Sequence, residues 1–254
     1  MESEAETVVI TPTLNERENI ALHVRDVFQA VPQVSMLVVD DGSRDGTIDE
    51  IEALRSTPYP RLHLLVRKGP PSFAASYRDG VQWALQNDFR FLISMDADRS
   101  HPATAIPALL RAAESSDLVV ASRYVRGVSV RNWPLRRVLL SAMANAYARV
   151  VTSLPCSDLT SGFCLYRAET VRDAVAGNLF TSGYAFLIEM KYRAWRAGAR
   201  LYEVPYTFVE RRLGTSKMSA RRLLEGIVAP ILCRVLLGRP DAEVRSRPTG
   251  RDET

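Results

Sequence analysis

Short apolar runs alternate with helix-like stretches along the first hundred residues. Four runs have the length and the apolar, often β-branched content of buried strands: residues 7–10, 36–39, 62–66 and 91–95. Three stretches between them carry apolar residues at helical spacing: residues 20–28, 48–54 and 74–85. Strands that alternate with helices, without the close spacing of hairpins, predict an α/β fold with a doubly wound, mostly parallel sheet. The ligand crevice of such a sheet lies beyond the carboxyl ends of its strands.

The pattern changes after a fifth predicted strand at residues 118–121. Four later segments follow: a helix with an apolar stripe at 135–154, a strand at 201–208, a polar loop at 210–217, and an amphipathic helix interrupted at Pro230. We therefore expect three parts along the chain: an α/β domain at 1–218, an amphipathic helix at 219–238, and a disordered tail at 239–254.

Composition places the chain among ordinary globular proteins. Its 254 residues are 46% hydrophobic and 24% charged, and no run reaches the roughly 18 apolar residues of a spanning helix. The acidic start does not resemble a secretory or organellar leader, so we expect the protein to stay in the cytoplasm. Cys156, Cys164 and Cys233 lack metal-ligand spacing, and we expect them to be buried, reduced thiols.

Charge is distributed unequally along the chain. Residues 1–120 hold 11 Lys and Arg against 18 Asp and Glu, a net charge of −7, whereas residues 121–254 hold 22 against 11, a net charge of +11. The basic half favours an anionic partner. Nucleic acid, anionic lipid and phosphorylated substrates all meet that requirement by charge alone.

The clearest chemical signal is Asp96-Ala97-Asp98, which directly follows a predicted buried strand. Two carboxylates with one residue between them, where a strand gives way to a loop, are suited to one divalent cation that bridges the oxygens of a diphosphate. Oxygen ligands favour Mg²⁺ or Mn²⁺. We therefore predict that Asp96 and Asp98 bind this metal.

A second acidic pair, Asp40-Asp41, ends another predicted strand. It is placed either to bind a nucleoside in the crevice or to form the turn before the next helix. The sequence lacks G-x-G-x-x-G after the first strand and also lacks G-x-x-x-x-G-K-[ST]. Both absences argue against a dinucleotide dehydrogenase and a P-loop phosphotransferase.

Eight motifs, in order, resemble those of the inverting family-2 glycosyltransferases of the dolichol/polyprenol phosphate mannose synthase type. They span residues 7–218 and stand at residues 11–16, 38–47, 95–102, 122–124, 130–134, 158–163, 183–190 and 211–217. The resemblance implies a GT-A fold, a nucleotide-sugar donor with GDP-mannose favoured, a polyprenyl phosphate acceptor, and no nucleic acid.

The resemblance also implies roles for individual residues. The nucleotide-sugar site would contain Pro12, Leu14, Glu16, Val39, Asp41, Asp96, Ala97, Asp98, Arg123, Arg211 and Lys217. The acceptor phosphate would bind Arg123, Arg137 and Ser141. The residues implied to carry the reaction are Asp98, Arg123, Arg211 and Lys217, the last two on a loop that closes over the diphosphate.

The expected reaction is a direct displacement with inversion, in which the acceptor phosphate is itself the nucleophile. A phosphomonoester has a second pKa of about 6, so no protein base is needed. This agrees with the scattered positions of His23, His63 and His101, of which only His101 lies near the metal motif.

The last helical segment predicts contact with a membrane surface or with a membrane-anchoring subunit. Its apolar residues recur at helical spacing: Leu223, Leu224, Ile227, Val228, Ile231, Leu232, Val235 and Leu236. Arginines flank them: Arg221, Arg222, Arg234 and Arg239. This pattern is typical of interfacial helices and predicts peripheral attachment at the cytoplasmic face, although a helix that packs on the domain shows the same pattern.

Several residues differ from the family's usual ones. Leu14 stands where an aromatic residue is usual, Ser72 and Ala74 replace glycines, and Leu187 replaces a polar residue. The donor is therefore open between GDP-mannose and another sugar nucleotide such as UDP-glucose. Two further alternatives are a catalytically silent glycosyltransferase-like binding subunit and a metal-dependent nucleotidyltransferase, although the latter usually carries a Gly-rich basic loop after the first strand.

Overall fold

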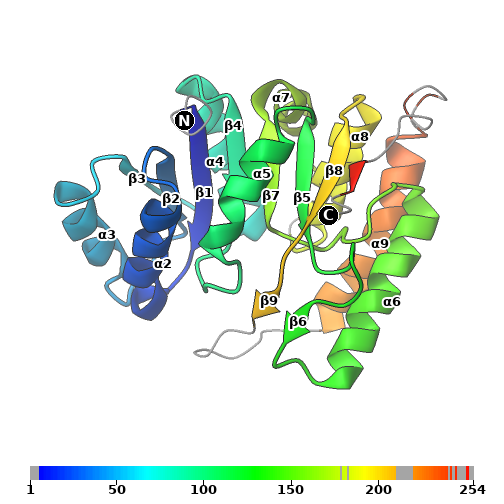
Figure 1. Cartoon of the computed structure of the whole chain (residues 1–254), viewed down its shortest axis with the longest axis horizontal. Helices are drawn as coiled ribbons and strands as arrows, with labels where there is room; N and C mark the ends of the chain where they lie inside the picture. Colours follow the sequence, from blue (N-terminus) through cyan, green and yellow to red (C-terminus); the bar gives the residue numbers. More distant parts are fainter. Residues whose placement is uncertain are drawn as a thin grey trace.

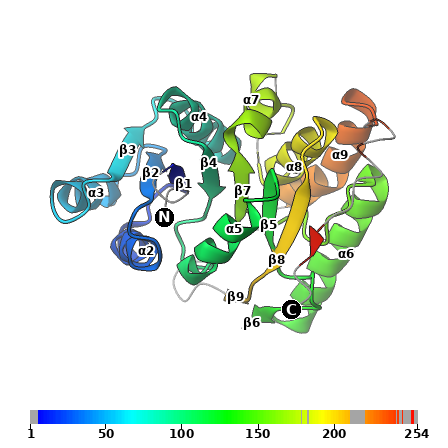
Figure 2. The same cartoon turned by 45° about the horizontal axis from the view of Figure 1, so that its top comes forward.

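The structure is a computed structural model that describes residues 6–177, 179–181, 183–209, 220–239, 241, 244 and 250–251. One main sheet crosses the molecule, and helices cover both of its faces (Figures 1 and 2). The first half consists of β1 (Thr7–Thr13), α2 (Arg17–Ala30), β2 (Ser35–Asp40), α3 (Thr47–Ser56), β3 (Leu62–Val66), α4 (Phe73–Gln86) and β4 (Phe91–Ser94). The predicted alternation of strands and helices is confirmed here.

The second half contains mostly shorter strands and the two longest helices, α6 and α9. Its elements are η1 (Ala103–Ala105), α5 (Ile106–Ala112), β5 (Leu118–Ser122), β6 (Val130–Arg131), α6 (Leu135–Thr152), β7 (Cys164–Arg167), α7 (Ala168–Ala176), α8 (Phe186–Arg196), β8 (Leu201–Pro205), β9 (Phe208–Val209), α9 (Ala220–Leu236) and β10 (Gly250–Arg251).

The main sheet has the strand order β10-β8-β5-β7-β4-β1-β2-β3. All neighbours pair in parallel except β7, which runs antiparallel between β4 and β5. The mostly parallel α/β sheet is thus confirmed. Strand β7 was not predicted, because its four residues carry no periodic signal and both of its partners lie far away in the sequence.

Two apolar layers sandwich the centre of the sheet. Val8 and Ile10 of β1 belong to one layer and Val9 belongs to the other, as the period of two along a strand requires. On the first face α4 approaches β1 closely at Gly80, where an added Cβ would lie 2.6 Å from Ile10 Cγ2. The glycine permits this contact, which fixes α4 against the strands that end at the crevice.

One predicted strand differs in detail from the structure. The late strand expected at residues 201–208 is divided into β8, in the main sheet, and β9, which pairs with β6 as a separate two-stranded ribbon. The backbone N–H of Tyr206 still donates to the Ser122 carbonyl at 3.1 Å, and the chain then turns away from β5. In Figure 1 this ribbon lies below the main sheet, on the side where β8 ends.

Helices α6 and α9 lie side by side at one end of the molecule (Figures 1 and 2). Tyr147 Oη donates to the Ile227 carbonyl at 2.8 Å across this contact. Helix α9 continues through Pro230, so the predicted interruption is wrong. Within the expected tail, Gly250 and Arg251 pair in parallel with β8.

Candidate active site

The acidic residue that ends β2 is used within the fold. Asp40 is fully buried, and its carboxylate accepts hydrogen bonds from Thr13 Oγ1 at 2.9 Å and from the backbone N–H groups of Gly42 and Ser43 at 2.9 and 2.7 Å. These bonds close the turn after β2 against the end of β1. Of the two earlier interpretations of the pair, Asp40 therefore fits the turn.

Asp41 points toward the start of α4. Its buried carboxylate accepts from the Arg67 guanidinium, from the Ser72 backbone N–H at 2.9 Å and from Ser76 Oγ at 2.8 Å. Arg67 also donates to Asp79 at 2.7 Å. A nucleoside that binds Asp41, as predicted, would have to share or replace one of these donors.

The remaining residues predicted for the nucleoside divide into two groups. Leu14 is 37% exposed, and Pro12 and Glu16 are partly exposed, so the end of β1 offers a surface to a ligand. Val39 is 0% exposed and belongs to the apolar layer between β2 and α4, where its Cγ2 faces Gly80. The predicted nucleoside contact of Val39 would therefore not involve an exposed side chain, because strand β2 is covered on both faces.

Asp96 and Asp98 lie in the loop after β4, with Ala97 buried between them. The Asp96 side chain is 28% exposed, and its Oδ1 lies 3.4 Å from the Tyr77 hydroxyl, which donates to it. Asp98 is partly exposed, and its Oδ1 accepts from the Ser100 backbone N–H at 3.1 Å. Both carboxylates thus reach the surface at the carboxyl end of the sheet.

His101 lies directly behind the acid pair. Its Nδ1 accepts the backbone N–H of Asp96 at 3.1 Å, and its Nε2 is 3.9 Å from Asp96 Oδ2. Burial lowers the pKa of His101 to about 4. The ring is therefore neutral near pH 7 and supports the loop through its hydrogen bond.

The acid pair meets the requirements of an Mg²⁺ or Mn²⁺ site that is completed by substrate. Among the residues that the structure describes, no group of three His, Cys, Asp or Glu side chains is arranged to hold a metal. Mg²⁺ in phosphate sites is commonly held by one or two carboxylates, with diphosphate oxygens and water at its other positions. Two surface-reaching carboxylates fit that arrangement.

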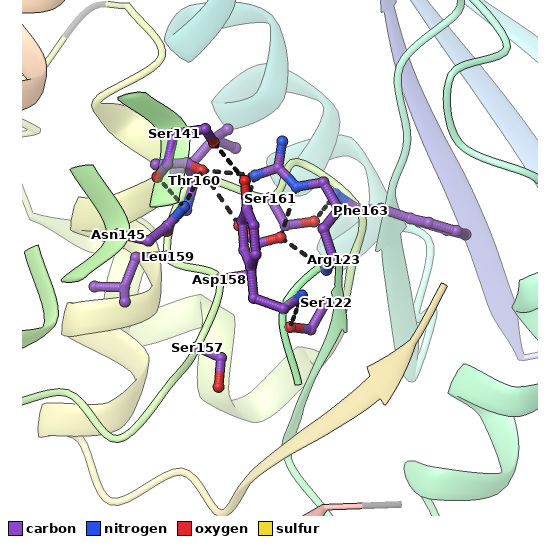
Figure 3. Close-up of polar contacts among 12 residues, drawn as sticks. Ser122, Arg123, Ser141, Asn145, Ser157, Asp158, Leu159, Thr160, Ser161 and Phe163 are labelled. Atoms are coloured by element: carbon purple, nitrogen blue, oxygen red, sulfur yellow. Dashed lines mark hydrogen bonds and ion pairs between the residues drawn. The ribbon is translucent and has the colours of Figure 1, made fainter. Parts of the chain in front are cut away.

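Arg123 is the central residue of the basic side of the site, the region that also contains Arg137 and Ser141. Its Nε and Nη2 donate to the fully buried Asp158 carboxylate at 2.7 and 2.6 Å, and Nη2 also donates to Thr160 Oγ1 at 2.7 Å (Figure 3). Burial alone would lower the pKa of Arg123, but the adjacent Asp158 carboxylate outweighs it and raises that pKa. Burial would likewise raise the pKa of Asp158, but Arg123 holds it below its ordinary value. Arg123 is thus a buried cation in a bidentate ion pair.

The predicted acceptor-phosphate residues converge around Arg123. The Arg137 guanidinium lies over the Trp133 ring at 4.2 Å, and Arg123 lies 5.6 Å from the centroid of the same ring. Ser141 Oγ accepts from the hydroxyl of Tyr124, the residue after Arg123, at 2.8 Å. The structure therefore brings Arg123, Arg137 and Ser141 into one region between β5 and the start of α6.

The acidic and basic sides are neighbours. The His101 ring, which supports Asp96, lies 6.2 Å from the Phe208 ring, and the Arg123 guanidinium lies 5.7 Å from that ring. A Cβ added to Gly162 would lie 3.6 Å from Asp96 Oδ1, and Gly162 belongs to the segment that contains Asp158. A ligand at the end of the sheet is thus within reach of both the carboxylates and the arginines.

Two predicted residues and one predicted segment lie outside the described residues: Arg211, Lys217 and the loop at 210–217. Sequence reasoning did not assign roles to Asp158, Thr160, Trp133 or Arg67, all of which contact site residues. Asp158 had a usable signal, since it is the one acid in its motif. The others depend on contacts between distant segments, which the sequence pattern does not reveal.

Comparisons with known proteins place these features in context. The family model described as glycosyl transferase family 2 matches residues 8–174. The polyprenol monophosphomannose synthase of Mycolicibacterium smegmatis is 42% identical over 222 residues, which cover 87% of this chain and 84% of that protein. The undecaprenyl-phosphate mannosyltransferase of Micrococcus luteus is 39% identical over 221 residues, which cover 87% of this chain and 90% of that protein.

Solved structures agree on the fold. Glucosyl-3-phosphoglycerate synthase from Mycobacterium tuberculosis, in complex with Mn²⁺, uridine diphosphate and glucosyl-3-phosphoglycerate, superposes with a TM-score of 0.66 at 18% identity, over 95% of this chain and 85% of that chain. At this identity the similarity shows a shared fold. The GT-A fold predicted from the sequence is confirmed.

Proposed function

This chain belongs to glycosyl transferase family 2, and we propose that it transfers mannose from GDP-mannose to the phosphate of a polyprenyl (dolichyl) phosphate with inversion. The observation that carries this proposal is the meeting of a surface-reaching acid pair, Asp96 and Asp98, with two arginines on one tryptophan ring at the same end of the sheet. One side suits a metal-bound diphosphate and the other suits a second phosphate. The names of the two relatives, at 42% and 39% identity, support mannose and a polyprenyl phosphate as the transferred sugar and the acceptor.

In the proposed reaction, an oxygen of the acceptor phosphate forms a bond to the anomeric carbon while the bond from that carbon to the donor diphosphate breaks. The acceptor oxygen is already anionic near neutral pH, so no proton has to move to a protein base. The neutral state of His101 and its hydrogen bond to Asp96 are consistent with a supporting role.

The chain's own residues have to bring two anions together. Asp96 and Asp98 would hold Mg²⁺ or Mn²⁺, which supplies positive charge to the leaving diphosphate. Arg123, Arg137 and Ser141 would hold the acceptor phosphate, with the Arg123 guanidinium already fixed by Asp158. Arg211 and Lys217 are proposed to close over the donor diphosphate.

The acceptor is a lipid, and we propose that the protein associates peripherally with the cytoplasmic face of the membrane through α6 and α9. Helix α6 has its apolar side on the outside: Leu135, Met143 and Val150 are 71%, 68% and 76% exposed, whereas Asn145 and Thr152 are buried. The adjacent α9 also exposes apolar residues: Leu224, Ile227, Val228, Ile231, Val235 and Leu236. No described helix is long and apolar enough to span a bilayer.

Arginines occur beside this apolar face. Arg126, Arg131 and Arg136 are exposed in and before the first turn of α6, close in sequence to the proposed phosphate-binding Arg137. An apolar face next to basic residues suits the surface of a bilayer that contains anionic lipid. The acceptor phosphate would then meet Arg137 at the level of the lipid head groups.

A donor panel tests the chemistry. The protein is incubated with polyprenyl phosphate, Mg²⁺ or Mn²⁺, and radiolabelled GDP-mannose or UDP-glucose, and the organic phase is then counted. We expect label in the lipid with GDP-mannose and its loss on chelation of the metal. Label from UDP-glucose alone would support the alternative donor, and no lipid product from any sugar nucleotide would support a silent binding subunit.

Vesicle flotation tests the membrane contact. We expect the wild type to float with vesicles that contain anionic lipid, and the double variant Leu135→Ser, Met143→Ser to remain at the bottom of the gradient. Val66→Ser is the control, because Val66 is 43% exposed on β3, away from α6 and α9. Equal flotation of both variants would contradict the assignment, and binding only in the presence of a membrane protein would favour an anchoring subunit.

A further inference from the structure

A buried loop joins the two sides of the site, and side chains provide many of the hydrogen-bond partners of its backbone. Residues 154–163 form no helix or strand, yet most of them are buried. Thr160 N donates to Asn145 Oδ1 at 3.2 Å, and the Gly162 carbonyl accepts from Ser94 Oγ at 2.7 Å. Ser157 N donates to Glu203 at 2.9 Å. Buried backbone groups need such partners, so these side chains determine where the loop lies.

Lys191 provides the most unusual of these partners. It lies on α8, is 0% exposed, and its Nζ donates to the carbonyls of Ser161 at 2.6 Å, Leu159 at 3.1 Å and Leu187 at 3.2 Å. A fully buried lysine is rare, and this one uses its three donors on carbonyl oxygens. Two of these carbonyls belong to the loop and one to its own helix, so the ammonium joins the loop to α8.

The two loop carbonyls stand on either side of Thr160. Thr160 Oγ1 accepts from Arg123 Nη2 at 2.7 Å and lies 3.2 Å from Asp158 Oδ1 (Figure 3). A displacement of the backbone at 159–161 would therefore move both acceptors that orient the Arg123 guanidinium. Lys191 and Arg123 are thus connected through the single segment 159–161: Lys191 binds its carbonyls, and Arg123 binds the side chain of Thr160.

We propose that Lys191 is a positioning residue for the acceptor phosphate. By holding the carbonyls of Leu159 and Ser161, it fixes Thr160 and Asp158 beneath the Arg123 guanidinium and so sets the direction in which that guanidinium meets the phosphate. This proposal rests on the proposed function for the identity of the ligand, whereas its structural part concerns the loop alone.

The test compares Lys191→Met with Tyr192→Phe. Methionine has a similar length but cannot donate, so the Leu159 carbonyl loses the lysine donor and the Ser161 carbonyl keeps only the weak thiol donor of Cys164 at 3.6 Å. Tyr192 is the neighbouring residue, also 0% exposed, and its hydroxyl donates to the Gly238 carbonyl at 2.6 Å, away from the loop. Each variant thus loses a hydrogen bond that a side chain of α8 donates to a carbonyl oxygen, but only Lys191→Met loses hydrogen bonds to the loop.

Steady-state kinetics separate positioning from general stability. For Lys191→Met we expect the KM for polyprenyl phosphate to rise about tenfold, with the KM for the sugar nucleotide within twofold of wild type. For Tyr192→Phe we expect both KM values to remain at the wild-type level. Unchanged acceptor KM in Lys191→Met, an equal rise in both KM values, or equal effects in the two variants would each overturn the proposal.

Amide hydrogen exchange and ligand binding provide a readout that does not need turnover. We expect the amides of Thr160 and Arg123 to exchange faster in Lys191→Met than in Tyr192→Phe, and geranyl phosphate to bind more weakly in calorimetry. If the wild type makes no mannolipid, the proposed function fails while these two measurements still decide the role of Lys191. Unchanged loop exchange overturns the proposal whatever the activity.

A second variant covers the case in which Lys191→Met does not fold. Thr160→Val keeps the shape of the side chain and removes the hydroxyl between the loop and Arg123. We expect the same selective rise in acceptor KM, and a combined Lys191→Met, Thr160→Val protein, where it folds, to be no worse than the more affected single variant. A normal acceptor KM in Thr160→Val would overturn the proposal.

Discussion

The acidic and the basic sides of the site are built in opposite ways. Asp96 and Asp98 reach the surface from a short loop after β4, whereas Arg123 is buried against Asp158 and Thr160, in a loop that several elements hold in place. The acidic side presents two partly exposed carboxylates to a metal and a diphosphate. On the basic side, two of the three guanidinium nitrogens of Arg123 donate to Asp158 and Thr160, so the guanidinium is already oriented before a ligand binds. The comparison suggests that metal and donor complete one half of the site, while the protein itself completes the other.

The largest expected effect is on the acidic side. In Asp98→Asn the amide oxygen still accepts from the Ser100 N–H, so the fold should be kept, but one carboxylate charge for the metal is lost. We expect transfer to fall about a thousandfold, since a metal contributes several kcal/mol to charge stabilisation. The measurement is mannolipid formation with saturating donor, together with a melting curve.

Asp88→Asn is the matched control, because Asp88 is an exposed aspartate in the loop before β4. It should retain wild-type transfer and a wild-type melting temperature. If Asp98→Asn turns over like this control, or if turnover ignores a chelator, the acid pair is not the metal site and the comparison between the two sides fails.

On the basic side, a substitution of the same type should affect folding as well as activity. Asp158→Asn leaves Arg123 as a buried cation with a neutral partner, and breaking a buried ion pair typically costs about 3–5 kcal/mol. We expect that loss in the free energy of unfolding and roughly a hundredfold lower transfer. Urea titration and the lipid-product assay measure the two quantities.

Glu52→Gln supplies the comparison for that ion-pair loss. Glu52 pairs with Arg55 at 3.0 Å on α3, the two side chains are 50% and 40% exposed, and such surface pairs contribute about 1 kcal/mol or less. An equally small change in Asp158→Asn would show that the basic side is no more rigidly built than an ordinary surface pair.

A smaller effect is expected where the basic side opens to its ligand. Arg137→Lys keeps the positive charge but loses the planar group that stacks on Trp133 at 4.2 Å. We expect the KM for polyprenyl phosphate to rise about tenfold, with little change in stability. Arg136→Lys, on the adjacent exposed arginine, should leave that KM unchanged, and equal KM values for the two variants would remove Arg137 from the phosphate site.

The contrast also explains which features the sequence could predict. The parallel strands and the acid pair after β4 are local patterns, so both were recognisable in a few consecutive residues. The partner of Arg123 lies 35 positions later in the chain, and nothing in the sequence pairs it with Asp158 rather than with another acid. Helix α6 illustrates a different limit: periodicity predicted an apolar stripe, but only the packing around Asn145 shows that the stripe faces outward.

Val39 illustrates the same limit for strands. Strand β2 is buried throughout, so its residues have no polar-apolar alternation to tell the crevice end from the core. The sequence alone therefore could not show that the Val39 side chain lies in the apolar layer under α4.

The smallest expected effect on transfer is that of replacing His23, a buried histidine next to the acidic side. The basic side buries paired ions, whereas next to the acidic side His23 of α2 is buried as a neutral ring, with Nε2 3.1 Å from Thr11 Oγ1, and burial lowers its pKa from 6.5 to about 4. The unfolded chain takes up a proton at that histidine below pH 6.5, and the folded chain does so only near pH 4, so stability falls as the pH drops through this window. His23 should contribute a loss of about 1.4 kcal/mol in the free energy of unfolding per pH unit within this window.

In His23→Gln, which keeps a hydrogen-bonding group, the slope of unfolding free energy against pH should be shallower by that amount while transfer at pH 7.5 stays normal. His63→Gln, at a half-buried ring, should change the slope less, and identical slopes in His23→Gln and wild type would mean that His23 is already protonated in the fold and that both sides of the site bury charge.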